Sequence, residues 1–395
     1  MLNDNQKKEV LGLLTKLIKA RSYSGQEDLV VAALKDHMTE NGFDEIAVDR
    51  YGSITGTIRG NRPGPNILYD GHIDTVPVPD PQAWTHDPFG AQIVEGKLYG
   101  RGTSDMKGAV AAMVCAASNF KKETKGNFAG SVSIAGVVHE ECFEGIAARE
   151  ISRRLNPDYV IIGEASELNL KIGQRGRAEI TVKTFGVPAH SANPQCGVNA
   201  VMSMMKLIGQ LEQIQPPTHP TLGAGVNVLT DIISSPYPGA SVVPSLCRAT
   251  YDRRLLVGEK PDDVLAPLKQ AVLKLSETDP NFKADVSLAT GREQCHTGDF
   301  IEGKRFFPGW LFDSNEPFIQ KALAALQKIG LNPMVTHYCF CTNGSHYAGE
   351  KGIKTFGFGP SRENLAHTID EYIELEQLYS ATAGYLAISQ ALLGV

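Results

Sequence analysis

Five side chains that can bind metal ions stand in this sequence, three of them near the ends of short apolar stretches and two in loops. They are His72, Asp105, Glu141, Glu164 and His367. Two histidines and three carboxylates are ligands that suit two Zn²⁺, Mn²⁺ or Co²⁺ ions, and the set contains no cysteine of the kind that purely structural zinc sites use. These residue types therefore indicate a divalent-metal centre, at which a bound water can become a nucleophile.

Three of these ligands, His72, Glu141 and Glu164, come directly after β-rich runs. The runs are Asn66–Tyr69, Ser131–Val138 and Tyr159–Ile162. Because α/β sheets bind ligands at the carboxyl ends of their strands, we expect the three side chains to meet at one edge of a sheet. Asp74 lies two residues after His72 and so on the same face of a continuing strand. A metal-binding histidine usually needs a carboxylate or a carbonyl on its second ring nitrogen, and Asp74 is well placed to supply it.

Glu140 and Glu141 are adjacent carboxylates at the end of a buried strand, an arrangement that is costly without a cation. Neighbours in a strand point to opposite sides, so one can bind metal while the other holds a water. The alternative is a solvated acidic turn. His139 is a rival ligand, which we place below the glutamates.

Asp105 lies in a loop with two glycines and a Thr-Ser pair, just before a helix rich in small residues. Taken locally, Thr103, Ser104 or Asp105 could simply cap the amides of that helix. The functional interpretation gives Asp105 a carboxylate that bridges two cations.

The first and last parts of the chain alternate helix-like and strand-like patterns, which predicts an α/β domain with a mixed sheet flanked by helices. The expected helices are Asn3–Arg21, Glu27–Asn41, Met106–Phe120, Glu316–Ile329 and Glu371–Leu393. A further strand is expected at Lys354–Gly357. Between these parts the pattern reads β-α-β-β-α-β, the split ferredoxin-like arrangement. We expect a catalytic domain formed by residues 1–175 and 293–395, with an inserted α+β lid domain at residues 176–292.

The composition limits the class of partner. The chain has 395 residues, 42% of them hydrophobic and 21% charged, and a net charge of −6, which argues against nucleic acid or an anionic membrane as partner. No run approaches the roughly 20 apolar residues of a membrane span, and nothing resembles a targeting signal. Seven scattered cysteines indicate free thiols in a reducing compartment, so we expect a cytoplasmic protein.

Six motifs in order along nearly the whole chain resemble the M20 metallopeptidase family, which includes deacylases, desuccinylases and carboxypeptidases. The motifs are HIDT, GRGTSDMKG, HEEC, GEAS, GVPAHSA and AHTIDE. Three more stretches, Gly173–Arg177, Tyr251–Leu255 and Thr342–Gly344, resemble a subgroup linked to selenium metabolism in bacteria.

The resemblance implies a role for each candidate residue. His72, Asp105 and Glu164 would hold one cation, and Asp105, Glu141 and His367 the other; Zn²⁺ is preferred, with Co²⁺ or Mn²⁺ as alternatives. Glu140 would be the general base for a water shared by the metals, and Asp74 would orient His72. The resemblance also implies a cis peptide between Asp105 and Met106, and a homodimer formed through the lid, in which His190 stabilises the oxyanion at the other subunit's site.

At the substrate end, the resemblance implies that Arg254 binds a substrate carboxylate. We expect Arg253 beside it to be a solvent-facing strand residue, and the choice between the two arginines stays open. The family often has Asn before Val-Val-Pro, but this chain has Ser241, so Arg175 and Asn343, with Gly344, are expected to replace that contact. The expected function is hydrolysis of an N-acyl or peptide bond in a small substrate that bears a carboxylate. The alternatives are removal of a carbamoyl or other acyl group, or a metal-containing protein that binds a ligand without hydrolysing it.

Overall fold

The computed structural model describes residues 2–395, which form two compact units. Unit 1 contains the described residues up to Gln174 together with Arg292–Glu302 and Leu311–Val395, and unit 2 contains Arg175–Gly291 and Gly303–Trp310. Residues 303–310, which were expected in the catalytic domain, thus belong to unit 2. The reason is that β17 (Phe306–Phe307) pairs with the central strand β9 (Gly176–Phe185) of that unit.

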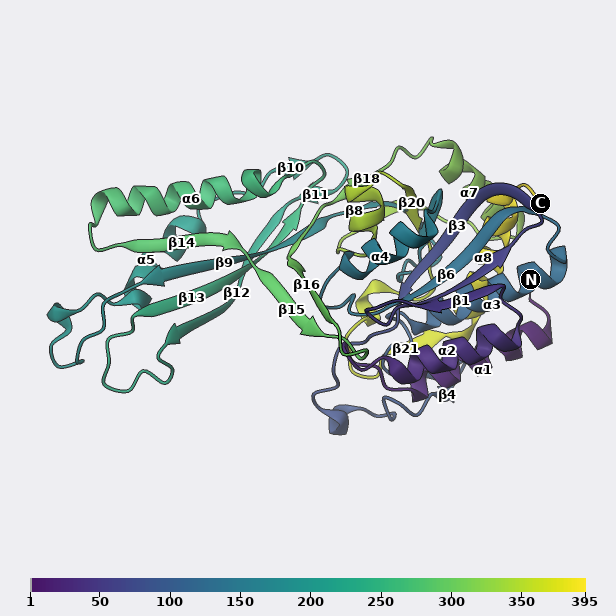
Figure 1. Ribbon diagram of the computed structural model, residues 1–395, viewed down its shortest axis with the longest axis horizontal. Helices are drawn as coiled ribbons and strands as arrows, with labels where there is room; N and C mark the ends of the chain where they lie inside the picture. The colour runs from purple at the N-terminus through teal and green to yellow at the C-terminus, as the bar shows by residue number, and fades with distance from the viewer. Residues whose placement is uncertain (1) are drawn as a thin grey trace. The chain divides into compact units, whose positions relative to one another are not determined.

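Unit 1 is built on a mixed nine-stranded sheet with the order β1-β2-β6-β3-β7-β20-β8-β18, and β19 pairs with β8 (Figure 1). The strands are β1 (Glu45–Val48), β2 (Ile54–Arg59), β3 (Arg62–His72), β6 (Ala129–Val137), β7 (Tyr159–Ile162), β8 (Leu170–Gln174), β18 (Trp310–Leu311), β19 (Val335–Tyr338) and β20 (Lys354–Gly357). A small sheet consists of β4 (Gln92–Val94), β5 (Lys97–Tyr99) and β21 (Tyr372–Glu374). The predicted α/β fold with a mixed sheet is confirmed.

The sheet brings three strand ends together, because β3 runs parallel to both β6 and β7 and lies between them. Parallel strands end at the same edge, so the residues after His72, Val137 and Ile162 meet there. The interior positions of these strands are almost fully buried, as near-continuous apolar runs in parallel strands require.

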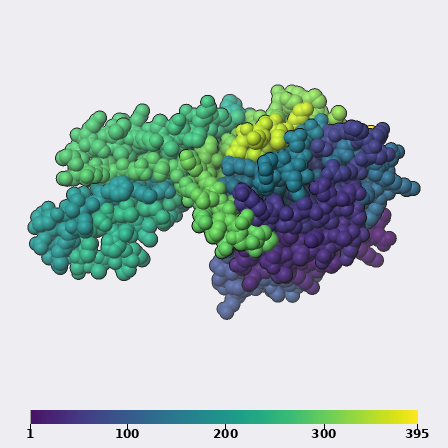
Figure 2. Space-filling view, viewed as in Figure 1, coloured from purple at the N-terminus to yellow at the C-terminus, as the bar shows by residue number. Residues whose placement is uncertain are grey.

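Six α-helices and three short helices belong to the described part of unit 1. They are α1 (Asp4–Lys19), α2 (Asp28–Glu40), α3 (Lys107–Thr124), α4 (Ile146–Leu155), α7 (Pro317–Lys328) and α8 (Leu375–Leu393), with η1 (Pro81–Ala83), the π-helix η3 (Ser345–Glu350) and η4 (Glu363–Leu365). The expected helix at 371–393 begins four residues later, since Tyr372–Glu374 is paired as β21. Helix α3 packs against α1 and α8. In the space-filling view, the purple N-terminal part of the chain lies on the surface of unit 1 (Figure 2).

Helix α1 shows why these segments are helical. Asn3 accepts from the Gln6 amide, and the Gln6 side chain accepts from the Asn3 amide, which forms a capping box. The basic residues of the last turn, Lys16 and Lys19, lie at the negative end of the helix dipole. Its buried residues are Val10, Leu13, Leu14, Leu17 and Ile18, the spacing of one helical face.

The loop before α3 depends on two glycines. Gly102 has φ +90°, a conformation that residues with a Cβ rarely adopt. At Gly108 an added Cβ would lie 2.4 Å from the Thr103 carbonyl oxygen, so the loop can fold back onto α3 only over a glycine. Together they fix the backbone on both sides of Asp105, and the predicted cis peptide between Asp105 and Met106 is present.

Unit 2 is an antiparallel sheet with the order β12-β13-β9-β14, and two helices cover one of its faces (Figure 1). Its elements are β9, the 3₁₀ turn η2 (Pro194–Cys196), α5 (Ala200–Leu211), β10 (Thr218–His219), β11 (Gly223–Ala224), β12 (Val226–Ser235), β13 (Leu246–Leu255), α6 (Pro261–Thr278), β14 (Lys283–Leu288) and β17. Alternate residues of β9 and β13 enter a core with α5 and α6. The predicted β-α-β-β-α-β order is confirmed.

The chain passes between the units within the hairpin of β15 (Thr290–Gln294) and β16 (Phe300–Lys304). Across residues 2–395, no helix combines the length and apolar character needed to span a bilayer.

Candidate metal centre

The five predicted ligands of unit 1 meet at the carboxyl edge of the sheet, and we call them the strand-end cluster. They are His72, Asp105, Glu141, Glu164 and His367. They form two overlapping groups in which the possible ligand atoms lie within 4.8 Å of one another. One group consists of His72, Asp105 and Glu164. The other consists of Asp105, Glu141 and His367, so Asp105 belongs to both groups.

The two oxygens of Asp105 face different histidines. Oδ1 lies 2.9 Å from His72 Nε2, and Oδ2 lies 2.9 Å from His367 Nε2. His72 Nε2 is also 3.6 Å from Glu164 Oε1, and His367 Nε2 is 3.1 Å from Glu141 Oε1. This is the arrangement that one carboxylate needs if it is to bridge two ions.

The charges in this cluster favour cations. Burial, reinforced by the neighbouring Asp105, raises the pKa of Glu164 well above its ordinary value and also raises the pKa of Glu141. The hydrogen bond to Asp105, followed by that to Glu141, raises the pKa of His367 to about 10. Carboxylates crowded in this way repel one another, and two divalent cations would neutralise them. The donor set therefore fits a dinuclear centre with only nitrogen and oxygen ligands.

Glu140 lies beside the cluster but belongs to neither ligand group. It is 6% exposed, and its Oε1 atom is buried without a hydrogen-bond partner among the described residues. Burial raises the pKa of Glu140 well above its ordinary value, and the carboxylates of Glu164 and Glu141 add to this effect. A buried carboxyl with a raised pKa and an unsatisfied oxygen is a group that can take part in proton transfer.

Asp74 contacts His72 mainly through its main chain. The nearest acceptor for His72 Nδ1 is the main-chain oxygen of Asp74 at 2.9 Å, and the carboxylate is 3.6 Å away. The carboxylate instead accepts hydrogen bonds from the Ser24 hydroxyl and from the amides of Glu140 and Glu141. Asp74 thus orients the imidazole through its backbone and holds the turn that carries both glutamates through its side chain.

Glu371, which was not among the predicted site residues, supports the Asp105 loop. Its carboxylate is fully buried, accepts from Arg101 Nη1 at 2.6 Å and accepts from the amides of Gly102, Ser104 and Asp105. Its position in the AHTIDE motif, just after His367, was the only signal in the sequence. The bridging carboxylate is therefore held by a buried acid from a distant segment.

Asn343 and Gly344, expected to contact substrate, are both buried. Asn343 donates to Asp70 Oδ1 at 2.9 Å, and its Oδ1 accepts from the Gly145 amide at 2.8 Å. Both ends of the amide are therefore engaged inside unit 1, where they support the strand that ends in His72. His139 is also buried, belongs to neither ligand group and lies next to Gly25.

The remaining predicted residues belong to unit 2. His190 is exposed, and its Nδ1 accepts from the Ala192 amide. Arg254 is half-buried with its Nε 2.9 Å from Asp252, while Arg175 Nη1 donates to the Ala224 carbonyl. The expectation for Arg253 was wrong, because this side chain is 5% exposed and forms an ion pair with Glu259 at 2.6 Å.

The chain is similar to known proteins over nearly its whole length. The family model described as peptidase family M20/M25/M40 matches residues 68–391. The YgeY protein of Escherichia coli is 30% identical over 383 residues, which cover 95% of this chain and 92% of that protein. A succinyl-diaminopimelate desuccinylase of Cereibacter sphaeroides is 34% identical over 393 residues, 96% of this chain and 97% of the relative.

Among solved structures, the fold is similar to that of the Bacillus subtilis YXEP protein, described as a dinuclear metal-binding peptidase of the M20 family. The TM-score is 0.72 at 14% identity, with 99% of this chain and 100% of that chain covered. The family model and the relatives both extend over most of the sequence, and the resemblance seen in its motifs is confirmed. This chain belongs to peptidase family M20/M25/M40, a family of metallohydrolases.

Proposed function

We propose that this protein hydrolyses an N-acyl or peptide bond in a small substrate that bears a carboxylate. In this proposal His72, Asp105 and Glu164 hold one divalent cation, and Asp105, Glu141 and His367 hold the second. The observation that carries it is the position of Asp105, whose two oxygens each lie 2.9 Å from a different histidine.

Bound cations would polarise the scissile carbonyl and lower the pKa of a coordinated water toward neutrality. Glu140 accepts the proton of the attacking water and returns it to the leaving amine. Its burial and its unsatisfied Oε1 support this role, since a base that is already hydrogen-bonded would have to break that contact first. Asp74 keeps Glu140 and Glu141 in place through their amides.

At the substrate end, Arg254 is the proposed carboxylate-binding group. Its side chain remains 32% exposed although the guanidinium pairs with Asp252, so a substrate carboxylate can compete for it. His190, exposed on unit 2, is the proposed donor to the oxyanion.

Zn²⁺ is the proposed metal, because two imidazoles among the ligands suit it better than Mg²⁺. We also propose a cytoplasmic location, since none of the seven cysteines forms a disulfide.

The test is a hydrolysis screen of the metal-free protein after addition of Zn²⁺, Co²⁺ or Mn²⁺ separately. The panel contains N-acetyl and N-succinyl amino acids, dipeptides, N-carbamoyl amino acids and matched substrates whose carboxylate is amidated. Metal-dependent turnover that is lost on amidation supports the proposal. Turnover of carbamoyl substrates alone would replace amide hydrolysis with the carbamoyl alternative, and no turnover with any metal would refute the assignment.

We also propose a homodimer formed through unit 2. Strand β12 lies at the edge of its sheet and exposes Val228, Ile232 and Ile233 by 48%, 47% and 43%. An exposed apolar edge strand can pair with a second copy of itself. Light scattering should give two chains per particle, and Ile232→Lys should give one; a monomeric wild-type protein would contradict the dimer.

A further inference from the structure

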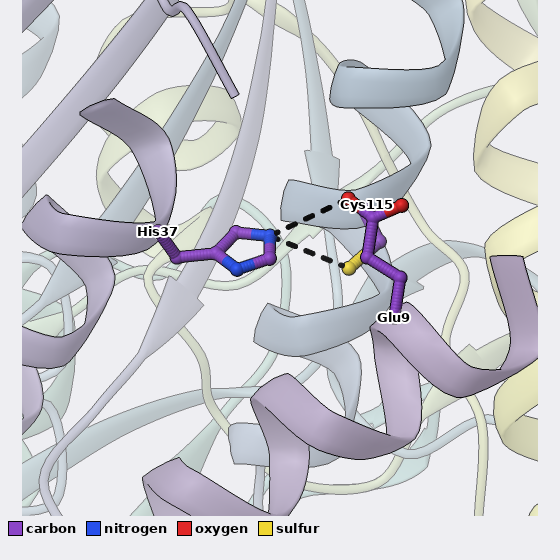
Figure 3. Close-up of side chains that lie close together, drawn as sticks. All are labelled: Glu9, His37 and Cys115. Carbon is purple, nitrogen blue, oxygen red and sulfur yellow. Dashed lines mark hydrogen bonds and ion pairs between the residues drawn. The ribbon is translucent and has the colours of Figure 1, made fainter. Parts of the chain in front are cut away.

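A second group of possible metal ligands lies away from the strand-end cluster, where helices α1, α2 and α3 pack together. We call Glu9, His37 and Cys115 the helix cluster, and Figure 3 shows each side chain coming from a different helix. His37 Nε2 lies 3.8 Å from Cys115 Sγ and 3.8 Å from Glu9 Oε1. Three ligands of three chemical types thus converge on one point.

We propose that the helix cluster is a binding site for one Zn²⁺-type ion, with Glu9, His37 and Cys115 as ligands and water in the fourth position. Thiolate, imidazole and carboxylate are the three ligand types of zinc sites in proteins. In a tetrahedral site with normal zinc–ligand distances, sulfur and nitrogen ligands lie about 3.5 Å apart, and nitrogen and oxygen ligands about 3.3 Å. The observed 3.8 Å separations need to shorten by only a few tenths of an ångström.

The surroundings favour a neutral imidazole. His37 is 8% exposed, and burial lowers its pKa, so Nε2 has a lone pair available at neutral pH. Asn41 Nδ2 lies 3.2 Å from the same nitrogen and would turn away on binding, which the partly exposed end of α2 permits. Among the described residues around this imidazole are also the charged groups of Glu40 and Lys16.

The thiol is the group that an ion would change most. Cys115 is fully buried, and burial raises its pKa well above the ordinary value, so without an ion it stays protonated. On binding, the ion replaces the thiol proton, which passes to solvent, and the new S–metal bond supplies the charge compensation. The reaction involves no oxidation or reduction.

Glu9 is the flexible ligand. Its side chain is 22% exposed, and both carboxylate oxygens lie 3.3 Å from Nζ of Lys122, whose side chain is 54% exposed. Lys122 also donates to Asn41 Oδ1. Because Lys122 can move into water at little cost, the ion can take its place beside Glu9.

Metal binding at the helix cluster can be detected separately from binding at the strand-end cluster. Cobalt bound to a thiolate gives a charge-transfer band in the near ultraviolet, and the strand-end cluster contains no cysteine. The reduced, metal-free protein is titrated with Co²⁺ in its wild-type, Cys115→Ser, Glu9→Gln and Cys142→Ser forms. Cys142 is the matched control, because it directly follows Glu141 and could otherwise be the source of a thiolate signal.

We expect the band in the wild type and in Cys142→Ser, its complete loss in Cys115→Ser, and cobalt affinity at least tenfold weaker in Glu9→Gln. Circular dichroism checks that each variant is folded, and Glu9→Gln changes only a partly exposed side chain. A wild-type protein that shows no band at saturating cobalt would overturn the proposal. A band that survives Cys115→Ser, or disappears in Cys142→Ser, would do the same.

Discussion

The strand-end cluster and the helix cluster are both sets of metal-ligand side chains in unit 1, but they are supported in different ways. The strand-end ligands are held by buried groups: Glu371 fixes the Asp105 loop, and Asp74 fixes the turn of Glu140 and Glu141. The helix cluster is bordered by Lys122, which is more than half exposed.

The two clusters also differ in how the negative charge of their carboxylates is balanced. The strand-end cluster has more buried carboxylates than nearby cationic side chains, so it needs metal ions for its charge to be balanced. In the helix cluster, Lys122 neutralises Glu9 and a protonated thiol is uncharged, so the ion-free state is stable. We therefore expect the strand-end cluster to bind metal more tightly and to be the site of reaction.

The largest expected effect is a loss of kcat, and it tests whether hydrolysis takes place at the strand-end cluster. Replacing Glu140 with Gln removes the proposed base but keeps the shape of the side chain, so kcat should fall by about 10²–10⁴. Metal content, measured by elemental analysis, should not change, since Glu140 is not among the ligands. Glu45→Gln, at an exposed ion pair on β1, is the control and should keep full activity. A Glu140→Gln protein with normal kcat would show that the base assignment is wrong.

The next largest effect tests whether buried groups hold the strand-end cluster more firmly than exposed groups hold the helix cluster. Glu371→Ala leaves Arg101 buried without its partner, which should lower the free energy of unfolding by about 3–5 kcal/mol. Lys122→Ala removes the partner of Glu9 at an exposed position, and its cost should be about 0–1 kcal/mol. Urea unfolding of the metal-free proteins measures both. Equal losses would mean that the two clusters do not differ in support.

The smallest effect concerns helix α1, which supplies Glu9. Asn3→Ala removes the capping box and should lower the free energy of unfolding by about 0.5–2 kcal/mol. Asn5→Ala, an exposed position two residues on, is the matched control and should change it by less than about 0.5 kcal/mol. If the two variants unfold alike, the cap does not stabilise this helix within the folded protein.

Much of the strand-end cluster could be predicted from the sequence, because its signal is local. A β-rich run followed directly by a ligand predicted the positions of His72 and Glu164, and parallel pairing of β3 with β7 brings them to one edge. Asp105 was ambiguous, since a carboxylate before a helix can be a cap or a ligand, and only the positions of His72 and His367 distinguish the two.

Other features depend on contacts that no short stretch of sequence encodes. Glu371 reaches back to a loop near residue 101, and Asp74 uses its main chain toward His72. Arg253 was expected to face solvent because its pairing with Glu259 arises only when the chain turns after β13. The helix cluster left no motif at all, since its three ligands lie on three separate helices.

Unit 2 is assembled from two separate segments of the chain, so it cannot be exchanged between relatives as one continuous piece. Strand β17 lies in the second segment, Gly303–Trp310, and pairs with β9 in the first. A recombination that moved only Arg175–Gly291 into a relative would therefore transfer a sheet without one of its strands and uncover Ala178 and Arg177 of β9. A chimeric protein that receives a complete unit 2 must therefore receive both segments from the same relative.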